Sequence, residues 1–284
     1  MKAVIPCGGL GTRFLPITKS IPKELLPIVD VPVLSYIINE SINSGITEAL
    51  IIINPKKQII KDYFSRDDEL YEKLYNLGKT DIIEQLHLFD NIDITFATQE
   101  RPLGSAHAVY LAKEFVGNEP FCLLLGDDVM QSDIPVAKQL IDAYEQTLSA
   151  IIGVQRCDDD DIVKCGVADV ISESGKLSRV KGIVEKPPLN SLPSRLACFG
   201  RYILKDIFRY IEGIEKARNG EYQLTDALNI QCEESSVFAY EFDGKRYDMG
   251  DKLSSLKAAI ELSMLRNDFG VELKNYIKEL ATRI

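Results

Sequence analysis

Three glycines stand directly before a run of basic residues in the stretch IPCGGLGTRFLPITKSIPKELLP, residues 5–27, which contains only one acid. Backbone N–H groups left open by glycines can line a phosphate, while Arg and Lys neutralise its charge. The spacing matches neither the dinucleotide pattern GxGxxG nor the P-loop pattern GxxxxGKS/T. The stretch is therefore either a phosphate-binding loop of another kind or a solvated basic loop. In the first case the binding groups are the backbone at Gly8, Gly9 and Gly11 and the basic side chains of Arg13, Lys19 and Lys23.

Two acidic segments offer oxygen ligands for a metal ion. In PFCLLLGDD, residues 120–128, an apolar strand ends in a glycine and two acids, and Asp127 would point into the crevice beyond the strand. The segment RYDMGD, residues 246–251, adds a second acid in an unusual setting. Two carboxylates, completed by water and phosphate oxygens, suit Mg2+, which proteins seldom enclose alone. The other interpretation is an ordinary turn or helix-cap Asp.

A carboxylate and an ammonium group are adjacent in IVEKPP, where Glu185 and Lys186 precede two prolines. A carboxylate can accept hydrogen bonds from sugar hydroxyls, and a Lys can bind a phosphate. In an extended strand the two side chains point to opposite faces unless a bulge brings them together. An exposed pair that ends a strand is the alternative. His107, in GSAHAV, is interpreted as a packed helical residue rather than a base, since no acid or nucleophile is near it in the sequence.

Short apolar strands alternate with helical segments over the first half of the chain. Strands are expected in 2–6, 49–54, 91–99, 120–128 and 149–155, and helices at 33–45, 57–78, from Ser105 and at 133–147. This alternation is typical of βαβ units in a mostly parallel sheet. Ligands bind beyond the carboxyl ends of the strands in such a sheet. Four polar segments should therefore meet in one crevice: the glycine loop, 99–104, 126–128 and 185–186.

The pattern changes from about residue 157. The run DDDD, residues 158–161, is interpreted as a solvated turn rather than a metal site. A strand–turn–strand unit over 166–188 indicates an antiparallel excursion from the sheet. The remaining expected elements are a helix at 204–216, a short helix from about Thr225, a strand at 236–242 and a helical tail from 251.

Composition limits the functions of the chain. It has 284 residues, 45% of them hydrophobic, and a formal net charge of −10, so a broad basic surface for nucleic acid or an anionic membrane is not expected. No segment has the roughly 20 apolar residues of a membrane span, and MKAVIPCGG lacks a signal-peptide pattern. The six cysteines form no CxxC pair and the two histidines stand apart, which indicates a reduced, cytoplasmic protein without a zinc site.

These motifs together resemble the sugar-phosphate nucleotidyltransferases, and most closely the bacterial UTP–glucose-1-phosphate uridylyltransferases (UDP-glucose pyrophosphorylases). The resemblance runs in order through GLGTRFLPITKSIPKELLPIVDVP, QERPLGSAHAV, PFCLLLGDD, IVEKPP, PSRLACFGRYIL, GEYQLTDAL and GKRYDMGD. It implies a Rossmann-like α/β nucleotidyltransferase fold, with a mostly parallel central sheet, flanking helices and a small antiparallel excursion. The implied reaction converts UTP and glucose 1-phosphate into UDP-glucose and pyrophosphate, with Mg2+ as cofactor.

The resemblance also implies which residues hold each ligand. For the uracil these are Gly8, Gly9, Gln99 and Gly104; for the triphosphate, Arg13 and Lys23; for Mg2+, Asp127 and Asp248; for the glucose, Gly166 and Glu185; and for its phosphate, Lys186. Arg13, Lys23 and Lys186 would then be the catalytic residues, and Asp128, Glu221 and Thr225 would line the pocket wall. The sequence departs from the usual family pattern at Cys7-Gly8, at Ser105-Ala106 and at Cys165.

We expect a single nucleotidyltransferase domain over residues 1–284. Its nucleotide part would cover about 1–155, its sugar-phosphate part about 156–250, and C-terminal helices about 251–284. The resemblance implies a homo-oligomer, either a dimer or a tetramer. Two alternatives stay open: the same chemistry with another nucleotide or sugar 1-phosphate, such as thymidylyl transfer, and a non-catalytic regulator that binds a sugar nucleotide.

Overall fold

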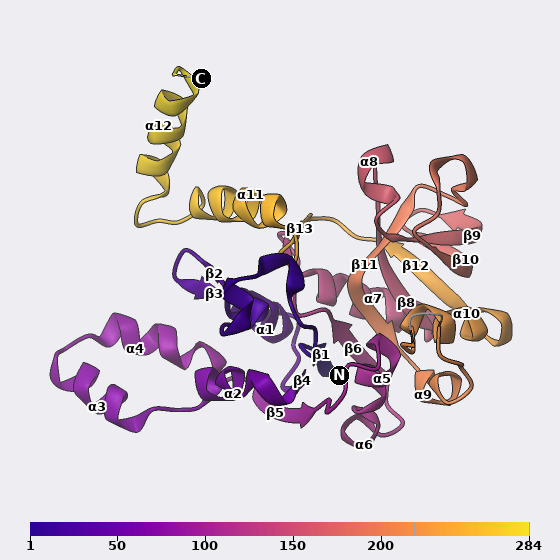
Figure 1. The fold of residues 1–284 in the computed structure, drawn as a ribbon, viewed down its shortest axis with the longest axis horizontal. Helices are drawn as coiled ribbons and strands as arrows, with labels where there is room; N and C mark the ends of the chain where they lie inside the picture. The colour runs from indigo at the N-terminus through magenta and orange to yellow at the C-terminus, as the bar shows by residue number, and fades with distance from the viewer. Residues whose placement is uncertain (218–219, 284) are drawn as a thin grey trace.

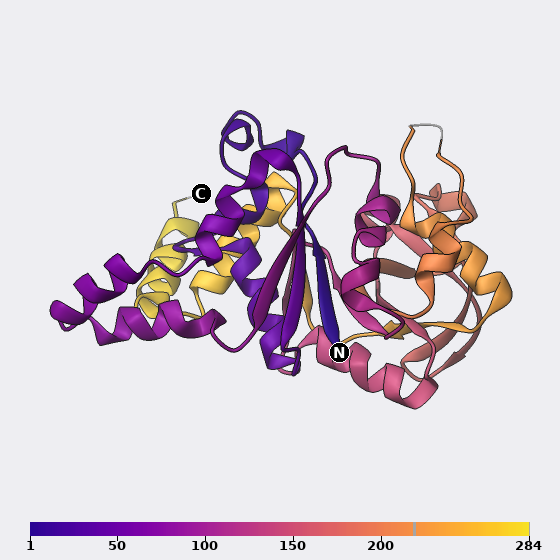
Figure 2. The same ribbon diagram turned by 90° about the horizontal axis from the view of Figure 1, so that it is seen from below.

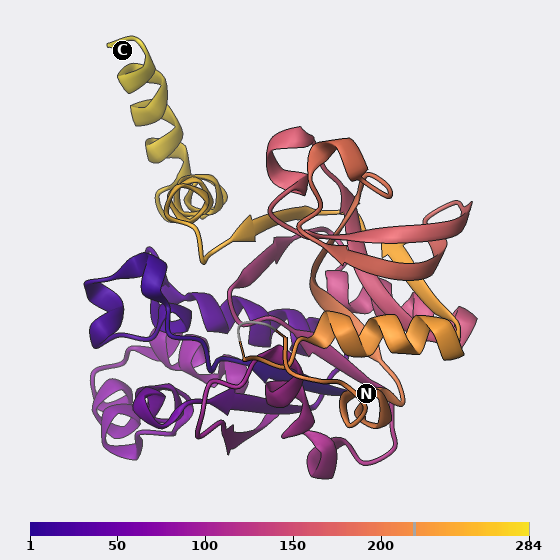
Figure 3. The same cartoon turned by 45° about the vertical axis from the view of Figure 1, so that its right-hand side comes forward.

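A nine-stranded mixed sheet forms the centre of the molecule in a computed structural model that describes residues 1–217 and 220–283 (Figure 1). Across the sheet the strands follow in the order β5 (Asp93–Thr98), β4 (Glu48–Ile53), β1 (Lys2–Pro6), β6 (Phe121–Leu124), β11 (Leu196–Leu204), β8 (Ala150–Arg156), β12 (Val237–Glu241), β10 (Leu177–Glu185) and β9 (Gly166–Ser174). Helices lie on both faces of the sheet, and the predicted α/β class is confirmed (Figure 3).

The first half of the sheet is parallel, as the sequence predicted. Strands β5, β4, β1 and β6 run in the same direction, and Ala3 of β1 lies opposite Ala49 of β4. Strands that are buried on both faces have continuously apolar sequences. Ile51, Ile52 and Ile53 of β4 are accordingly fully buried. The loops after β1, β5 and β6 therefore leave the sheet at the same edge.

The second half of the sheet contains more antiparallel pairing than the small excursion that we expected. Strand β11 is antiparallel to both β6 and β8, while β12 is parallel to β8. The predicted hairpin is confirmed as β9 and β10, and β10 is antiparallel to β12. Strand β11 was not predicted, because Gly200 and Arg201 interrupt its apolar run LACFGRYIL. It joins the two halves of the sheet.

Helices cover both faces of the sheet and enclose two hydrophobic clusters. The helices are α1 (Val33–Asn43), α2 (Ile59–Phe64), α3 (Asp68–Asn76), α4 (Thr80–Leu86), α5 (Ser105–Tyr110), α6 (Lys113–Val116), α7 (Val136–Thr147), α8 (Asp159–Ile162), α9 (Ile207–Ile211), α10 (Leu224–Glu234), α11 (Lys252–Ser263) and α12 (Gly270–Ala281). Ile37 of α1 and Leu140 of α7 belong to one cluster, and Val109 of α5 and Leu228 of α10 belong to the other. The helix expected at 204–216 is shorter than predicted, since β11 continues to Leu204.

The long segment after β1 is ordered, as expected, and contains only short elements. These are the 3-10 turns η1 (Thr12–Phe14), η2 (Ile17–Lys19) and η3 (Lys23–Leu25) and the small hairpin of β2 (Pro27–Ile28) and β3 (Val31–Pro32). Further short elements are η4 (Pro55–Lys57), η5 (His87–Phe89), η6 (Leu189–Ser191) and a two-stranded ribbon of β7 (Asp128–Gln131) and β13 (Lys245–Asp248). The ribbon brings RYDMGD next to the acids that follow β6.

The chain ends in the predicted helical tail. Figure 1 shows α12 projecting from the body, and Figure 2 shows α3 and α4 extending on the same side of the molecule. The predicted acidic turn at 158–161 is mostly the single-turn helix α8, in which the Asp158 carboxylate accepts a hydrogen bond from Asp161 N. Within 1–217 and 220–283, no helix has the length and apolar character needed to cross a membrane.

Candidate active site

The glycine loop after β1 is held by side chains from the turn that follows β4. Asn54 Nδ2 donates to Gly8 O at 2.9 Å, and Lys57 Nζ donates to Cys7 O at 2.7 Å. Gly11 has φ 65, a left-handed conformation that favours glycine, and its carbonyl accepts from Thr18 Oγ1 at 2.7 Å. The backbone of the loop is therefore set in place before any ligand binds.

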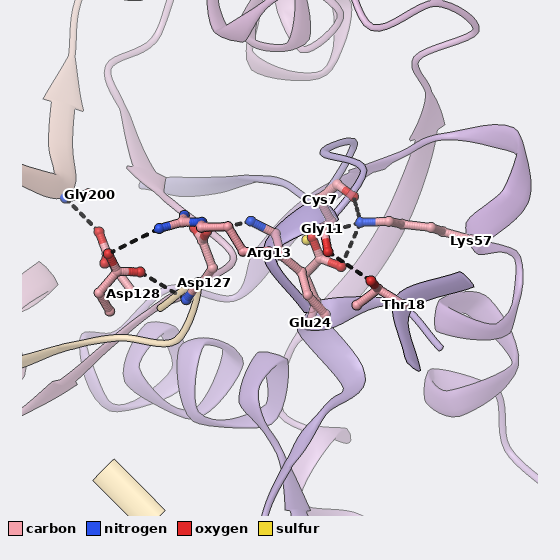
Figure 4. Close-up of polar contacts among 12 residues, drawn as sticks. Cys7, Gly11, Arg13, Thr18, Glu24, Lys57, Asp127, Asp128 and Gly200 are labelled. Carbon is pink, nitrogen blue, oxygen red and sulfur yellow. Dashed lines mark hydrogen bonds and ion pairs between the residues drawn. The ribbon is translucent and has the colours of Figure 1, made fainter. Parts of the chain in front are cut away.

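A buried ion pair lies beneath this loop. Lys57 Nζ is 2.8 Å and 2.6 Å from the two carboxylate oxygens of Glu24, and Figure 4 shows Lys57 reaching both Glu24 and Cys7. Glu24 is 1% exposed and Lys57 is 6% exposed. Burial raises the pKa of Glu24, while Lys57 and Lys23 oppose that effect. Sequence analysis missed this pair, because the two residues stand 33 positions apart without a shared motif.

The predicted phosphate-binding and metal-binding side chains meet around Gly250. A Cβ at Gly250 would stand 2.6 Å from Arg13 Nη2, 3.0 Å from Asp248 Oδ1 and 3.1 Å from Asp127 Oδ2. Lys23 Nζ forms an ion pair with the same Asp127 oxygen, and Arg13 Nη1 lies 3.8 Å from Asp248 Oδ2. Figure 4 shows Arg13 beside Asp127. Only a glycine leaves room for Arg13, Asp127 and Asp248 to converge at this point, and Lys23 joins them through Asp127.

The carboxylates of Asp127 and Asp248 fit Mg2+ as a pair. Burial tends to raise the pKa of Asp127, but Lys23, Arg13 and Arg246 outweigh it and hold that pKa below its usual value. The part of the chain that the structure describes contains no group of three or more His, Cys, Asp or Glu that could hold a metal. Mg2+ often takes one or two carboxylates and completes its shell with water and substrate phosphates. Asp127 and Asp248 supply two carboxylates beside one space.

Arg246 is a charged residue of the site that sequence analysis did not assign. Its Nη2 lies 2.7 Å from Asp128 Oδ1 and 3.6 Å from Asp248 Oδ2. The other oxygen of Asp128 accepts from Gly200 N at 3.1 Å, and Asp128 is only 3% exposed. Asp128 thus supports the site from behind and does not point into it. The signal for Arg246 was its position inside RYDMGD, the motif that also contains Asp248.

A second buried ion pair anchors the acids to the helices behind them. Arg201 of β11 is fully buried, and its Nη2 lies 2.6 Å from Glu40 Oε2 on α1. Arg201 also donates to Asp128 O at 2.7 Å, and Glu40 accepts from Ala137 N at the start of α7 at 3.0 Å. A charged residue within the apolar run LACFGRYIL was the available signal, because a buried charge requires a partner.

Of the residues expected at the base, Gln99 and Gly104 lie together between β5 and α5, while Gly8 and Gly9 lie in the loop after β1. Gln99 is 5% exposed and donates from Nε2 to Gly104 O at 3.2 Å. Gly104 has φ 102, and a Cβ there would collide with the backbone of Tyr222. Ser105, at which the sequence departs from the usual family pattern, forms a hydrogen bond through its side chain: Ser105 Oγ accepts from Leu224 N at 3.0 Å. The start of α5 is therefore tied to the segment before α10.

The residues expected at the sugar also lie together. Gly166 and Glu185 are opposite each other in β9 and β10, and Lys186 N donates to Cys165 O at 3.0 Å. Lys186 has φ 48, which turns the chain and leaves its Nζ 4.0 Å from Glu185 Oε1. The side chains of Glu185 and Lys186 therefore lie on the same side of the chain. In a regular extended strand they would point to opposite faces, so the turn at Lys186 brings them together.

Strand β10 reaches the site for a reason that differs from the predicted one. It is antiparallel to β12, so the rule for carboxyl ends of parallel strands does not place it. Instead, Gly166 pairs with Cys198 of β11, two residues before Gly200, which donates to Asp128. Strand β11 therefore links the sugar-side residues to the acidic residues.

Comparison with known proteins adds independent findings. A family model described as Nucleotidyl transferase matches residues 2–263. The UTP–glucose-1-phosphate uridylyltransferase of Bacillus subtilis (strain 168) is 43% identical over 284 residues, which are 99% of this chain and 97% of that protein. The structure of the UTP-bound UGPase from Acinetobacter baumannii superposes with a TM-score of 0.91 at 34% identity, covering 98% of this chain and 99% of that chain. A UDP-glucose pyrophosphorylase complexed with UDP-glucose gives a TM-score of 0.84 at 34% identity over 93% of this chain and 99% of that chain.

Proposed function

The chain belongs to the nucleotidyl transferase family, and from this premise we propose that it transfers a uridylyl group from UTP to glucose 1-phosphate. The products are UDP-glucose and pyrophosphate. The observation that carries the proposal is the convergence of Arg13, Asp127 and Asp248 around Gly250, with Lys23 paired to Asp127, in a chain that matches named uridylyltransferases over nearly its full length.

The reaction is an in-line substitution at the α-phosphorus of UTP. A phosphate oxygen of glucose 1-phosphate forms the new P–O bond, and the bond from the α-phosphorus to the bridging oxygen of pyrophosphate breaks. The attacking oxygen is already anionic near neutral pH, so no side chain has to remove a proton from it. Catalysis then consists of bringing two anions together and stabilising the charge of the leaving group.

The basic side chains of the site supply this stabilisation. Arg13, with its planar fork of donors, and Lys23 would bind the triphosphate, and Lys186 would bind the phosphate of the sugar. Lys23 is paired with Asp127 in the structure and is only partly exposed. An incoming phosphate could therefore replace Asp127 as the partner of an ammonium group that is already in position. Lys186 is largely exposed and has room to follow the incoming sugar phosphate.

Magnesium is the proposed cofactor, held by Asp127 and Asp248. When bound, Mg2+ would neutralise phosphate charge and polarise the phosphorus that is attacked. The two carboxylates converge on one space, and Arg246 and Arg201 hold the acidic segment that presents them. Gly8, Gly9, Gly11, Gln99 and Gly104 are proposed to bind the nucleotide. Gly166 and Glu185 are proposed to bind the glucose.

The proposal is tested by measuring pyrophosphate release from a panel of nucleoside triphosphates and sugar 1-phosphates, with and without Mg2+. UTP with glucose 1-phosphate should be among the best pairs. A stronger reaction with thymidine triphosphate would move the protein to the thymidylyl branch. Binding of UDP-glucose without turnover of any pair would support a non-catalytic regulator.

We further propose that the protein works in the cytoplasm as a homo-oligomer, either a dimer or a tetramer. All six cysteines are free thiols, which suits a reducing compartment. Apolar side chains on the C-terminal helices are exposed, among them Leu253 and Leu256 on α11 and Val271 and Tyr276 on α12. Exposed apolar surface of this kind favours association. Light scattering after size-exclusion chromatography would determine the number of subunits.

A further inference from the structure

The orientation of the Gln99 side-chain amide is determined by its neighbours. Gln99 Nε2 lies 3.2 Å from Gly104 O and 3.0 Å from His107 Nδ1. A backbone carbonyl can only accept a hydrogen bond, so the amide atom that faces Gly104 O must be the nitrogen. Gly104 O is itself fixed, because it also accepts from Ala108 N at 3.1 Å in the first turn of α5.

The same geometry determines the protonation of His107. One N–H of the Gln99 amide is used by Gly104 O, and the other points to His107 Nδ1, which must therefore carry no proton. Burial lowers the pKa of His107 from its usual 6.5, which favours this neutral form. His107 therefore packs on a helix, as predicted, and in addition accepts a hydrogen bond from the Gln99 amide.

Other titratable groups surround α5, but burial is the cause of the lowered pKa of His107. Strand β1, helix α9 and helix α10 pack against α5, and the segments 99–104 and 221–223 adjoin its start. The titratable side chains on α5 and these neighbours, with Glu212 directly after α9, are Tyr110, Lys2, Glu100, Arg101, Arg209, Tyr210, Glu212, Glu221, Tyr222, Asp226, Cys232, Glu233 and Glu234.

With both amide N–H groups in use, Gln99 can offer only its oxygen to a ligand. A Cβ at Gly8 would stand 2.5 Å from Gln99 Oε1, so this oxygen faces the glycine loop. Within 1–217 and 220–283, no side chain or backbone group donates a hydrogen bond to Gln99 Oε1. Such an acceptor pairs with a ring N–H of a base. Uracil has an N–H at position 3, whereas cytosine has a bare acceptor there.

We propose that His107 is a positioning residue for base selection, which holds the Gln99 amide so that its oxygen selects uracil over cytosine. The inference rests on the proposed function and extends it to the choice between two nucleotides with the same ribose and triphosphate. If His107 loses its acceptor or gains a proton on Nδ1, the Gln99 amide can turn and present its nitrogen to cytosine. Gly104 O still favours the original orientation, so discrimination should weaken and not invert.

The test compares kcat/KM for UTP and CTP, each with glucose 1-phosphate, in three variants. His107→Leu places a methyl group where Nδ1 was, and we expect the UTP/CTP ratio to fall about tenfold, the worth of one lost hydrogen bond. The change should come from KM, with kcat for UTP nearly constant. His107→Asn keeps an acceptor at the δ1 position and should keep the ratio. His87→Asn, at the exposed second histidine, is the matched control.

The dependence on pH separates this role from a merely structural one. Below the lowered pKa of His107, the wild-type ratio should fall, whereas the ratio of His107→Asn should stay level. An unchanged ratio in His107→Leu, or an equal loss in His107→Asn, would overturn the inference. Calorimetric binding of UMP and CMP gives the same comparison without turnover, should His107→Leu prove inactive. If the wild type does not use UTP at all, the proposed function fails instead.

Discussion

Removing the cation of the buried pair beneath the glycine loop should destabilise the protein strongly. In Lys57→Met, Glu24 at 1% exposure loses its ionic partner, and Cys7 O loses a donor at 2.7 Å. Breaking a buried ion pair by removing one partner costs about 3–5 kcal/mol. In a chain of this size each kcal/mol corresponds to roughly 2 °C, so Tm should fall by roughly 5–10 °C.

A double variant shows whether the unpaired acid causes this loss. Glu24→Met/Lys57→Met replaces both charged groups by apolar ones and leaves only Cys7 O without its donor, which costs about 1–3 kcal/mol. The double variant should therefore be more stable than Lys57→Met alone. Lys73→Met is the matched control, because Lys73 and Glu69 form an exposed pair on α3 that contributes less than about 0.5 kcal/mol.

The dependence on pH provides a further check. Burial raises the pKa of Glu24 above its ordinary value of 4.5, and Lys57 opposes this effect. Without Lys57 the folded-state pKa rises further above the unfolded one. A carboxyl group whose pKa is higher in the folded state than in the unfolded state does not lower the stability at pH values below its unfolded-state pKa. It lowers the stability as the pH rises from there through its folded-state pKa. The stability of Lys57→Met should therefore be closest to that of the wild type near pH 4.5, and the difference in stability should be largest near neutral pH.

Urea unfolding followed by circular dichroism, at acidic and neutral pH, measures all four proteins. The reasoning would be refuted if Lys57→Met lost no more stability than Lys73→Met, or if the double variant were less stable than the single one. Because Lys57 also positions the Cys7 carbonyl, kcat/KM of the Lys57→Met variant should fall even at temperatures where it remains folded.

Three further predictions concern the charged residues of the site. Lys186→Ala should lower kcat/KM about 10²–10³-fold with unchanged Tm, whereas Lys181→Ala, at an exposed lysine within β10, should leave both nearly unchanged. Gly250→Ala should lower kcat about 10²-fold, because its methyl group would occupy the space between Arg13, Asp127 and Asp248, and steady-state kinetics would detect this. Chelation should abolish pyrophosphate release and added Mg2+ should restore it; in Asp248→Asn the Mg2+ needed for half-maximal rate should rise more than about tenfold.

Most of the parallel half of the fold was predictable from local patterns. Continuous apolar runs such as ALIIIN become strands buried on both faces, and the glycines, prolines and acids that follow them mark the loops. Strand β11 escaped prediction because Arg201 breaks its apolar run, and the partner that makes this charge acceptable, Glu40, is 161 residues away. Local pattern carries no information about such a pairing.

By itself, the sequence determined the types of group available to the site: glycine backbone, basic side chains and two carboxylates. Only the tertiary structure decided their mutual geometry. The convergence on Gly250, the contact of Arg246 with Asp128 and the acceptor that His107 offers to Gln99 all join segments distant in the sequence or on separate elements. The physical reason is that hydrogen bonds and ion pairs depend on distances of a few ångströms, which packing sets and sequence spacing does not.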